Sequence, residues 1–271
     1  MIKLLINEQE VKFETTIFPD GTSQVWKLQN HIPFDPRDED PVILWLFENE
    51  AELMHVLQLA ALVQTHLNVS ECILRVPYLP YGRQDKGVSN KASFALHVFA
   101  DTLYRAGITR IETFDPHSLA SDIVYADSIM PTVQEFHESI LNHNIICFPD
   151  KGAADRYGKS VAFRNCSIIY CAKVRNQATG EILGLDLVGK EDDLIALNSG
   201  DILIVDDICD GGMTFIKVVE AIEKCATPRT IDLAVSHGLF SKGLEVLHDA
   251  GISRIYTTNS LLRNPEGFKV W

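Results

Sequence analysis

The sequence predicts an α/β fold built as two similar halves, each a mostly parallel sheet flanked by helices. Apolar runs of strand length alternate with segments of helical period through almost all of the 271 residues. Such alternation is typical of βαβ units and parallel sheets. The alternation restarts after Pro131 without a low-complexity linker. We therefore expect an N-terminal half at residues 1–131 and a C-terminal half at residues 132–271.

In the N-terminal half, three strands and two helices are predicted from the spacing of apolar residues. A short apolar run bounded by turn residues indicates a buried strand, and apolar residues at steps of three and four indicate a helix. The expected strands are residues 42–47, 72–76 and 110–114, and the expected helices are residues 50–66 and 94–106. A polar loop is expected at residues 78–90.

The same reasoning predicts a second strand–helix series in the C-terminal half. The expected strands are residues 145–148, 167–172, 202–205, 231–236 and 254–257. The expected helices are residues 133–141, a segment beginning at Ala153, and residues 214–224 and 242–250. Residues 173–186 are polar and contain glycine, so they are expected to form an open stretch.

The overall charge argues against nucleic acid and anionic membranes as partners. The 24 Lys and Arg residues face 37 Asp and Glu residues, which gives a net charge of -13. Such a surface repels polyanions, so a phosphate ligand would have to be held by a few placed cations, amides or metal ions. Solubility alone is the simpler explanation of the acidity. The expected partners are therefore small molecules.

The cysteine pattern and the hydropathy indicate a cytoplasmic protein. The six cysteines include no CxxC pair and no spacing typical of metal ligands. No apolar run approaches the roughly 20 residues of a membrane-spanning helix. The N-terminal apolar segment is too short and too soon acidic for a signal peptide.

Polar, glycine-containing clusters follow four of the predicted strands. They are PYLPYGRQDKG after Val76, DPHS after Phe114, PDKGAADRYG after Phe148 and DDICDGGMT after Val205. Chain reversal needs only Gly, Asn or Pro, whereas these loops are dense in Arg, Asp, His and Lys. Because ligands bind at the carboxyl ends of strands in such sheets, the clusters predict a site.

The most informative cluster is ILIVDDICDGGMT at residues 202–214. The paired carboxylates of Asp206 and Asp207 can accept hydrogen bonds from the vicinal hydroxyls of a ribose. Glycines that lead into a helix expose N–H groups to a phosphate. An acidic turn with a helix cap is the simpler alternative. The stretch resembles the ribose-phosphate loop of type I phosphoribosyltransferases, which implies ribose-phosphate binding by Asp206, Asp207, Asp210, Gly211, Gly212, Met213 and Thr214.

Other blocks narrow the resemblance to class I ribose-phosphate diphosphokinases, the phosphoribosyl diphosphate (PRPP) synthetases. The blocks are VPYLPYGRQDK, TFDPHS, FPDG, FPDKGAADR, AKVR and SHGLFS, and together they cover the chain from about Phe18 to Asn259. The resemblance implies two type I phosphoribosyltransferase-like halves, the first with the ATP and metal loops and the second with the ribose-phosphate loop. It also implies transfer of the β,γ-diphosphate of ATP to the anomeric hydroxyl of ribose 5-phosphate, with Mg²⁺.

The resemblance assigns roles to further residues. It places ATP binding at Phe18, Asp20, Arg83, Gln84 and Asp85, with the adenine pocket shared between subunits, so a homo-oligomer of at least two copies is expected. The fork of an arginine suits phosphate oxygens. Thr22 stands where the family usually has Glu, which weakens the adenine assignment.

Metal binding and catalysis are assigned in the same way. His117 and Asp150 match the ligands of the Mg²⁺ that bridges the ATP phosphates. Lys173 and Arg175 match a catalytic pair in a mobile loop, where cations would stabilise charge on the transferring group. The polar residues 176–186 suit a lid.

Two departures from the family pattern leave the acceptor open. Gly211 stands where a hydroxyl residue is usual, and Met213 stands where Gly is usual. The first change removes a donor and leaves space, as a capped phosphate such as that of ADP-ribose would need. ADP-ribose is therefore the alternative acceptor, giving ADP-ribose pyrophosphate for NAD⁺ salvage. A PRPP-using phosphoribosyltransferase and a non-catalytic regulatory protein are further alternatives, but they leave the other motifs or the catalytic residues unexplained.

Overall fold

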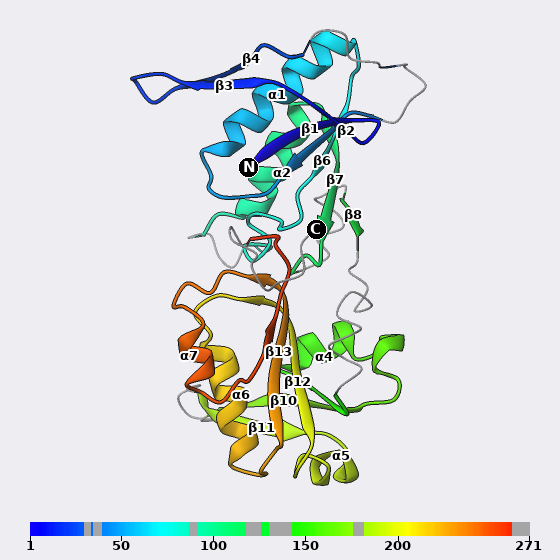
Figure 1. Ribbon diagram of the computed structural model, residues 1–271, viewed down its shortest axis with the longest axis vertical. Coiled ribbons are helices and arrows are strands. Elements are labelled where there is room, and N and C mark those ends of the chain that lie inside the picture. The colour runs from blue at the N-terminus through cyan, green and yellow to red at the C-terminus, as the bar shows by residue number, and fades with distance from the viewer. Residues whose placement is uncertain are drawn as a thin grey trace. The chain divides into compact units, whose positions relative to one another are not determined.

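The computed structural model describes residues 1–29, 34, 40–86, 92–117, 126–129, 143–175 and 182–261. The chain divides into two compact units, Met1–Met130 and Pro131–Trp271 (Figure 1). In the described part of each unit, strands form a six-stranded, mostly parallel sheet with helices against it. The predicted α/β fold class is confirmed.

The sheet of the first unit has the strand order β2-β1-β5-β6-β7-β8. Strands β5, β6, β7 and β8 are parallel, whereas β1 runs antiparallel to both β5 and β2. The strands are β1 (Ile2–Ile6), β2 (Gln9–Val11), β5 (Val42–Trp45), β6 (Cys72–Arg75), β7 (Ile108–Phe114) and β8 (Ala126–Ile129), with helices α1 (Glu52–Leu67) and α2 (Ala95–Arg105).

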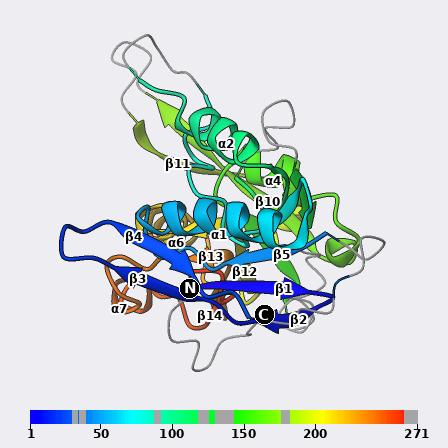
Figure 2. The same cartoon turned by 90° about the horizontal axis from the view of Figure 1, so that it is seen from above.

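An antiparallel hairpin of β3 (Glu14–Ile17) and β4 (Ser23–Trp26) lies beside α1, as Figure 2 shows. The amide of Gln58 on α1 holds it there. Gln58 accepts a hydrogen bond from the N–H of Val25 at 2.8 Å and donates one to the carbonyl of Ser23 at 3.0 Å. One glutamine thus satisfies two backbone groups of the strand that faces the helix.

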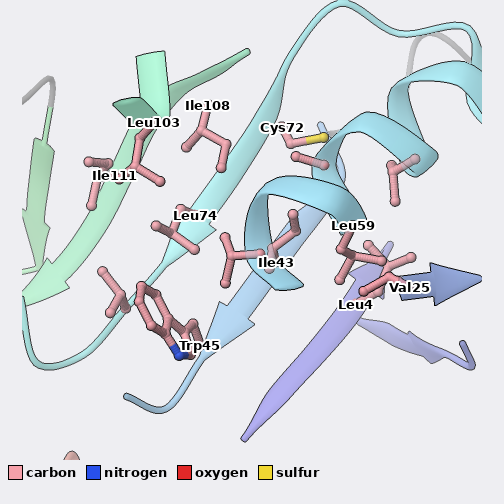
Figure 3. Close-up of a cluster of buried hydrophobic side chains, with 14 of the residues drawn as sticks. Leu4, Val25, Ile43, Trp45, Leu59, Cys72, Leu74, Leu103, Ile108 and Ile111 are labelled. Carbon is pink, nitrogen blue, oxygen red and sulfur yellow. The ribbon is translucent and has the colours of Figure 1, made fainter. Parts of the chain in front are cut away.

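The core of the first unit lies between its sheet and its helices (Figure 3). Trp45 and Leu74 from the sheet pack with Leu59 from α1 and Leu103 from α2, and all four are almost fully buried. Burial of each such side chain contributes about 1.5–3 kcal/mol. The indole N–H of Trp45 is satisfied by a 2.8 Å bond to Glu52, the first residue of α1.

The sheet of the second unit has the strand order β11-β10-β9-β12-β13-β14. All neighbouring strands are parallel except β11, which runs antiparallel to β10. The strands are β9 (Ile145–Phe148), β10 (Ser167–Arg175), β11 (Ile182–Val188), β12 (Asp201–Cys209), β13 (Thr230–Gly238) and β14 (Ile255–Tyr256). The helices are α4 (Lys151–Tyr157), a 3₁₀ turn (Val161–Phe163), α5 (Glu191–Ile195), α6 (Met213–Glu223) and α7 (Glu245–His248).

Both faces of this sheet are buried, which explains the continuous apolar runs of its strands. Along β12, Ile202 and Ile204 pack in a cluster that includes α6, whereas Leu203 and Val205 pack in a cluster that includes α4. Figure 1 shows α6 and α7 on one side of β12 and β13 and α4 on the other. The alternation along the strand fixes which side chain faces which helix layer.

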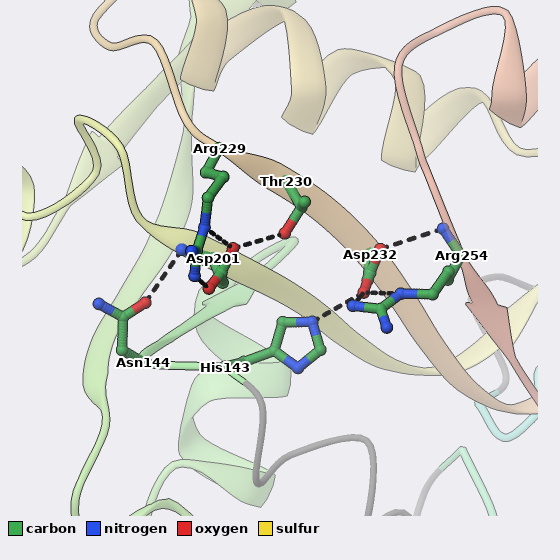
Figure 4. Close-up of polar contacts among 7 residues, drawn as sticks. All are labelled: His143, Asn144, Asp201, Arg229, Thr230, Asp232 and Arg254. Carbon is green, nitrogen blue, oxygen red and sulfur yellow. Dashed lines mark hydrogen bonds and ion pairs between the residues drawn. The ribbon is translucent and has the colours of Figure 1, made fainter.

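A polar network ties the amino ends of the strands of the second unit together (Figure 4). Asp232, at the start of β13, is fully buried and lies 2.8 Å from the Nε2 of the equally buried His143. It also accepts hydrogen bonds from the backbone and side chain of Arg254, at 3.0 and 2.8 Å. Burial alone would raise the pKa of Asp232, but these bonds outweigh it and hold the pKa below its ordinary value. Asp201 is bonded to Asn144, Arg229 and Thr230.

Most of the expected strands and helices occur with shifts of a few residues, whereas the open stretch predicted at residues 173–186 is wrong in part. Strand β10 continues to Arg175, and Ile182–Val188 forms β11, which pairs Lys173 with Leu185 and Arg175 with Ile182. Its sequence, ILGLDLV, has apolar residues at alternate positions, a strand signal that the polar flanks obscured. Residues 176–181 of the expected lid, and the expected helix 133–141, lie outside the described residues.

Other differences concern short or edge elements. The N-terminal strands β1, β2, β3 and β4 and the edge strand β8 were not predicted. In the described parts of the chain, no helix combines the length and the apolarity that crossing a bilayer requires. All six cysteines are free thiols.

Candidate functional site

The loops of the second unit that were predicted to bind ligand lie at the carboxyl ends of its parallel strands. Strands β9 and β12 are adjacent and parallel, with Ile202 opposite Ile145, so their carboxyl ends point the same way. Strand β13 runs parallel to β12 on its other side. The segments after these three strands therefore meet: Asp150 after β9, residues 210–214 after β12, and residues 239–242 after β13.

The acid pair belongs to β12 itself, because the strand extends to Cys209 rather than ending at Val205 as predicted. Asp207 is only 3% exposed, whereas Asp206 is partly buried. The N–H of Asp207 donates to Oδ1 of Asp206 at 2.9 Å. Burial, followed by the charge of Asp207, raises the pKa of Asp206 to about 8. The pair therefore offers a carboxyl that holds its proton at neutral pH beside a second acidic group.

Arg156 is a member of this site whose role was not predicted from the sequence. It lies on α4, where its NH1 is 3.5 Å from Oδ2 of Asp207 and donates to the hydroxyl of Tyr157 at 3.2 Å. Its guanidinium also lies over the Tyr157 ring, 5.4 Å from the centroid. The signal was present, since Arg156 closes the block FPDKGAADR, six residues after Asp150.

Asp150 is the N-cap of α4, and its Oδ1 accepts a 3.0 Å hydrogen bond from the N–H of Ala153. Capping orients the carboxylate and engages one of its two oxygens. His117, the other predicted metal ligand, follows β7 in the first unit and has an exposed side chain. Carboxylate and imidazole groups completed by nucleotide oxygens suit Mg²⁺. Among the described residues, no group of three or more His, Cys, Asp and Glu side chains is arranged to hold a metal ion.

The loop from Asp210 to Thr214 turns the chain from β12 into α6. Gly212 has a φ of +78°, and a Cβ at this position would lie 2.8 Å from Cδ2 of Leu247. Both the left-handed backbone and the close contact require glycine here. Helix α6 begins at Met213 without a side-chain cap, so its first turn presents N–H groups of the kind that bind anions. Asp210, Met213 and Thr214 are exposed around this turn.

The segment after β13 is fastened to this loop. The N–H of Leu239 donates to the carbonyl of Cys209 at 2.8 Å, and the N–H of Ser241 donates to the carbonyl of Asp210 at 3.2 Å. The hydroxyl of Ser241 donates to Oδ1 of Asp210 at 2.6 Å. Residues 239–241 are therefore held beside the loop that begins at Asp210.

The predicted catalytic residues Lys173 and Arg175 lie at the end of β10, in the hairpin with β11. The side chain of Lys173 is exposed. The backbone pairing fixes the base of this segment, while the residues that follow Arg175 lie outside the described part.

The predicted ATP-binding residues lie in two turns of the first unit. Phe18, which is 42% exposed, opens the turn between β3 and β4, where the N–H of Gly21 donates to its carbonyl at 2.9 Å. Asp20 accepts hydrogen bonds from the hydroxyl and the N–H of Thr22, at 2.7 and 3.0 Å, and these bonds lower the pKa of Asp20. The departure from the family pattern at Thr22 thus orients Asp20.

The second of these turns follows β6 and carries Arg83, Gln84 and Asp85. The N–H of Gln84 donates to the carbonyl of Tyr81 at 2.8 Å, and Tyr81 has a φ of +62°. The carbonyl of Gln84 accepts a 3.3 Å hydrogen bond from Leu96 on α2. Arg83 and Gln84 are exposed, and Asp85 is half-buried.

Comparison with known proteins gives consistent relatives over the whole chain. The ribose-phosphate pyrophosphokinase of Saccharolobus solfataricus is 26% identical over 259 residues, covering 93% of this chain and 85% of the relative. The enzyme of the same name from Sulfurisphaera tokodaii is 26% identical over 270 residues, covering 96% and 88%. No protein-family model matches the chain.

A solved structure supports the fold independently. The phosphoribosylpyrophosphate synthetase from Mycobacterium smegmatis superposes with a TM-score of 0.78, over 98% of this chain and 87% of that chain, at 18% sequence identity. At this identity the likeness concerns the fold, and it extends over both units.

Proposed function

The chain belongs to the ribose-phosphate pyrophosphokinase family, and on that premise we propose that it transfers the β,γ-diphosphate of ATP to the anomeric hydroxyl of ribose 5-phosphate. The products are PRPP and AMP. One observation carries the proposal. The acid pair of β12, the glycine loop before α6 and Asp150 come together at the carboxyl ends of the strands of the second sheet.

The acceptor is held at these carboxyl ends. Asp206 and Asp207 bind the vicinal ribose hydroxyls, and the two acids suit different roles. The raised pKa of Asp206 keeps a proton available for donation, whereas Arg156 near Asp207 favours a carboxylate that accepts. The N–H groups of Gly211, Gly212, Met213 and Thr214 bind the 5-phosphate.

The ATP side of the reaction is assigned to the remaining residues. Phe18, Asp20 and Gln84 contact the base, Arg83 binds the phosphates, and Asp85 belongs to the same ATP-binding turn. His117 and Asp150 would hold the Mg²⁺, which supplies charge neutralisation of the nucleotide phosphates when bound. Lys173 and Arg175 place positive charge where the transferring group becomes more negative, which lowers the activation barrier. On this proposal residues 1–131 carry the ATP and metal loops, and residues 132–271 carry the ribose-phosphate loop and the catalytic segment.

The reaction type is tested by product analysis. The protein is incubated with ATP, Mg²⁺ and either ribose 5-phosphate or ADP-ribose, and the products are separated and identified by mass spectrometry. Diphosphate transfer releases AMP in step with the new ester. Stoichiometric ADP would mean a simple kinase, and no turnover with either acceptor would favour a regulatory protein.

ADP-ribose remains the second candidate acceptor because Gly211 and Met213 depart from the family pattern. Met213 is 52% exposed at the edge of the loop, where an adenylate group could rest on it. The parallel incubations decide between the two acceptors. Turnover from PRPP and a purine or pyrimidine base would instead identify a phosphoribosyltransferase.

The proposal includes assembly of at least two copies in the cytoplasm. The β3–β4 hairpin supports it, because it exposes the large apolar side chains of Ile17, Phe18 and Trp26, and such side chains favour contact with another protein surface. Light scattering after gel filtration measures the mass. A monomer at the concentrations used for the assay would refute the shared ATP pocket.

A further inference from the structure

Lys242 lies against the loop that is proposed to bind the acceptor phosphate. It follows Ser241, whose backbone and hydroxyl are bonded to Asp210. The N–H groups of Leu239 and Phe240 also donate to the carbonyl of Cys209. The segment that carries Lys242 therefore follows β13 and is hydrogen-bonded to the end of β12. Its position is therefore set by the fold, although the side chain is exposed.

The aliphatic stem of Lys242 covers Gly211. A Cβ built on Gly211 would lie 3.5 Å from both Cδ and Cε of Lys242 and 3.7 Å from its Cγ, which is ordinary van der Waals contact. The space that the glycine leaves is thus bordered by lysine methylenes. Since the ammonium is one bond beyond Cε, it lies close to the position at which the family usually has a hydroxyl.

The negative charge at the carboxyl ends of these strands favours a cation beside the phosphate. Asp207, Asp210 and Asp150 all lie at the carboxyl ends of these strands, and their negative charges repel a phosphate. Arg156 is directed to Asp207. A terminal phosphate carries about -1.5 to -2 charge at pH 7, whereas each phosphate of a diphosphate diester carries a single charge. An ammonium group beside the loop therefore favours the terminal phosphate.

We infer that Lys242 binds the 5-phosphate of the acceptor, in place of the hydroxyl absent at Gly211, and selects a terminal phosphomonoester over a capped one. This inference rests on the proposed function of the loop. It makes Lys242 a specificity-determining residue of the chain, in a segment to which the sequence analysis assigned no role.

The test compares Lys242→Met with Lys224→Met. The first substitution keeps the stem over Gly211 and removes the charge. The second removes the same charge from an exposed residue at the far end of α6. For each protein, KM and kcat are measured with ribose 5-phosphate, ADP-ribose and ATP, and the affinity for ribose 5-phosphate and for unphosphorylated ribose is measured by calorimetry without ATP.

Loss of one charge-assisted hydrogen bond should raise the KM and the dissociation constant of ribose 5-phosphate about tenfold or more, with kcat and the KM of ATP nearly unchanged. The affinity for ribose, the constants for ADP-ribose and all values of Lys224→Met should stay near those of the wild type. The double variant Gly211→Ser with Lys242→Met should regain part of the affinity, because the serine restores a donor where the backbone tolerates a side chain.

Failure of the inference and failure of the proposed function give different results. An unchanged affinity of Lys242→Met for ribose 5-phosphate, in a chain that makes PRPP, overturns the inference alone. Equal losses for ribose 5-phosphate and ADP-ribose overturn the preference for a terminal phosphate. If the wild type makes no PRPP, the proposed function fails. The inference about Lys242 is then tested by calorimetry alone: it stands if Lys242→Met weakens binding of ribose 5-phosphate but not of ribose, and it is overturned if both affinities are unchanged. Lys242→Gln replaces the Met variant if that variant has a lowered melting temperature.

Discussion

Arg156 links α4 to the acid pair, and its effect can be isolated by mutation. Arg156→Met keeps an unbranched side chain against Tyr157 but removes the cation 3.5 Å from Asp207. The nearly buried Asp207 then loses the cation that lies beside its carboxylate. Because Asp207 is proposed to bind a ribose hydroxyl, we expect a higher KM for the acceptor, with the KM of ATP little changed. Arg164→Met, which changes an exposed arginine after the 3₁₀ turn, is the control. Equal rises in the KM of the acceptor and the KM of ATP, with a lowered melting temperature, would assign Arg156 a purely structural role.

The two proposed catalytic cations should act on turnover rather than on binding. Removing a charged group that stabilises a transition state costs about 2.7–4 kcal/mol, or a hundred- to a thousandfold in rate. Lys173→Ala and Arg175→Ala should each lower kcat by about this factor in steady-state assays, while the affinity for ATP changes little. Lys159→Ala, at an exposed position after α4, is the matched control. Near-normal kcat in both variants would remove the end of β10 from the mechanism.

At the scale of the element, the turn between β12 and α6 depends on one glycine. Gly212→Ala forces an L-residue into a left-handed conformation and brings its Cβ to 2.8 Å from Leu247, so the free energy of unfolding should fall by roughly 1–3 kcal/mol. Gly184→Ala on β11 is the control, since a Cβ there has no atom within 4 Å. Denaturant titrations of the two variants measure the difference. Equal stability of both would mean that the turn relaxes without cost.

The β10–β11 hairpin shows how an element can escape prediction. Its second strand lies at the sheet edge and follows polar residues, so its alternating apolar positions were interpreted as part of an open stretch. Parallel strands buried on both faces are easier, because each carries a continuous apolar run, as β9 and β12 do.

At the scale of the whole molecule, the second unit depends on the buried carboxylate of Asp232, which joins β13 to His143 and Arg254. Asp232→Asn removes the carboxylate charge that Arg254 and His143 face. Because Arg254 is half exposed, we expect the free energy of unfolding to fall by roughly 1.5–3 kcal/mol, the range for hydrogen bonds to a charged group. Asp249→Asn, at an exposed position, is the control. A loss in free energy of unfolding no larger than that of the control would show that the network adds no net stability.

The same carboxylate gives a pH dependence. Because the pKa of Asp232 is held below its ordinary value, its contribution is complete above that value, about 3.9, and is lost as the pH falls through the lower pKa of the folded state. The free energy of unfolding of the wild type should therefore decline more steeply below about pH 4 than that of Asp232→Asn. Denaturant titrations at a series of pH values measure both slopes, and parallel slopes would contradict the shift.

The sequence by itself predicted the α/β class, the resemblance to ribose-phosphate pyrophosphokinases and the main parallel strands. Each of these depends on signals that are local along the chain: apolar runs, helical spacing, and motifs such as the acids and glycines around Asp206 and Gly212. The site assignments carried by those motifs stay predictions until the variants are measured.

The tertiary structure alone decided which distant residues meet. Arg156 reaches Asp207 because β9 and β12 are neighbours in the sheet, and Lys242 covers Gly211 because the segment after β13 is bonded to Cys209 and Asp210. Such contacts follow from strand order and register. These in turn depend on how whole elements bury their apolar faces, which no short stretch of sequence specifies.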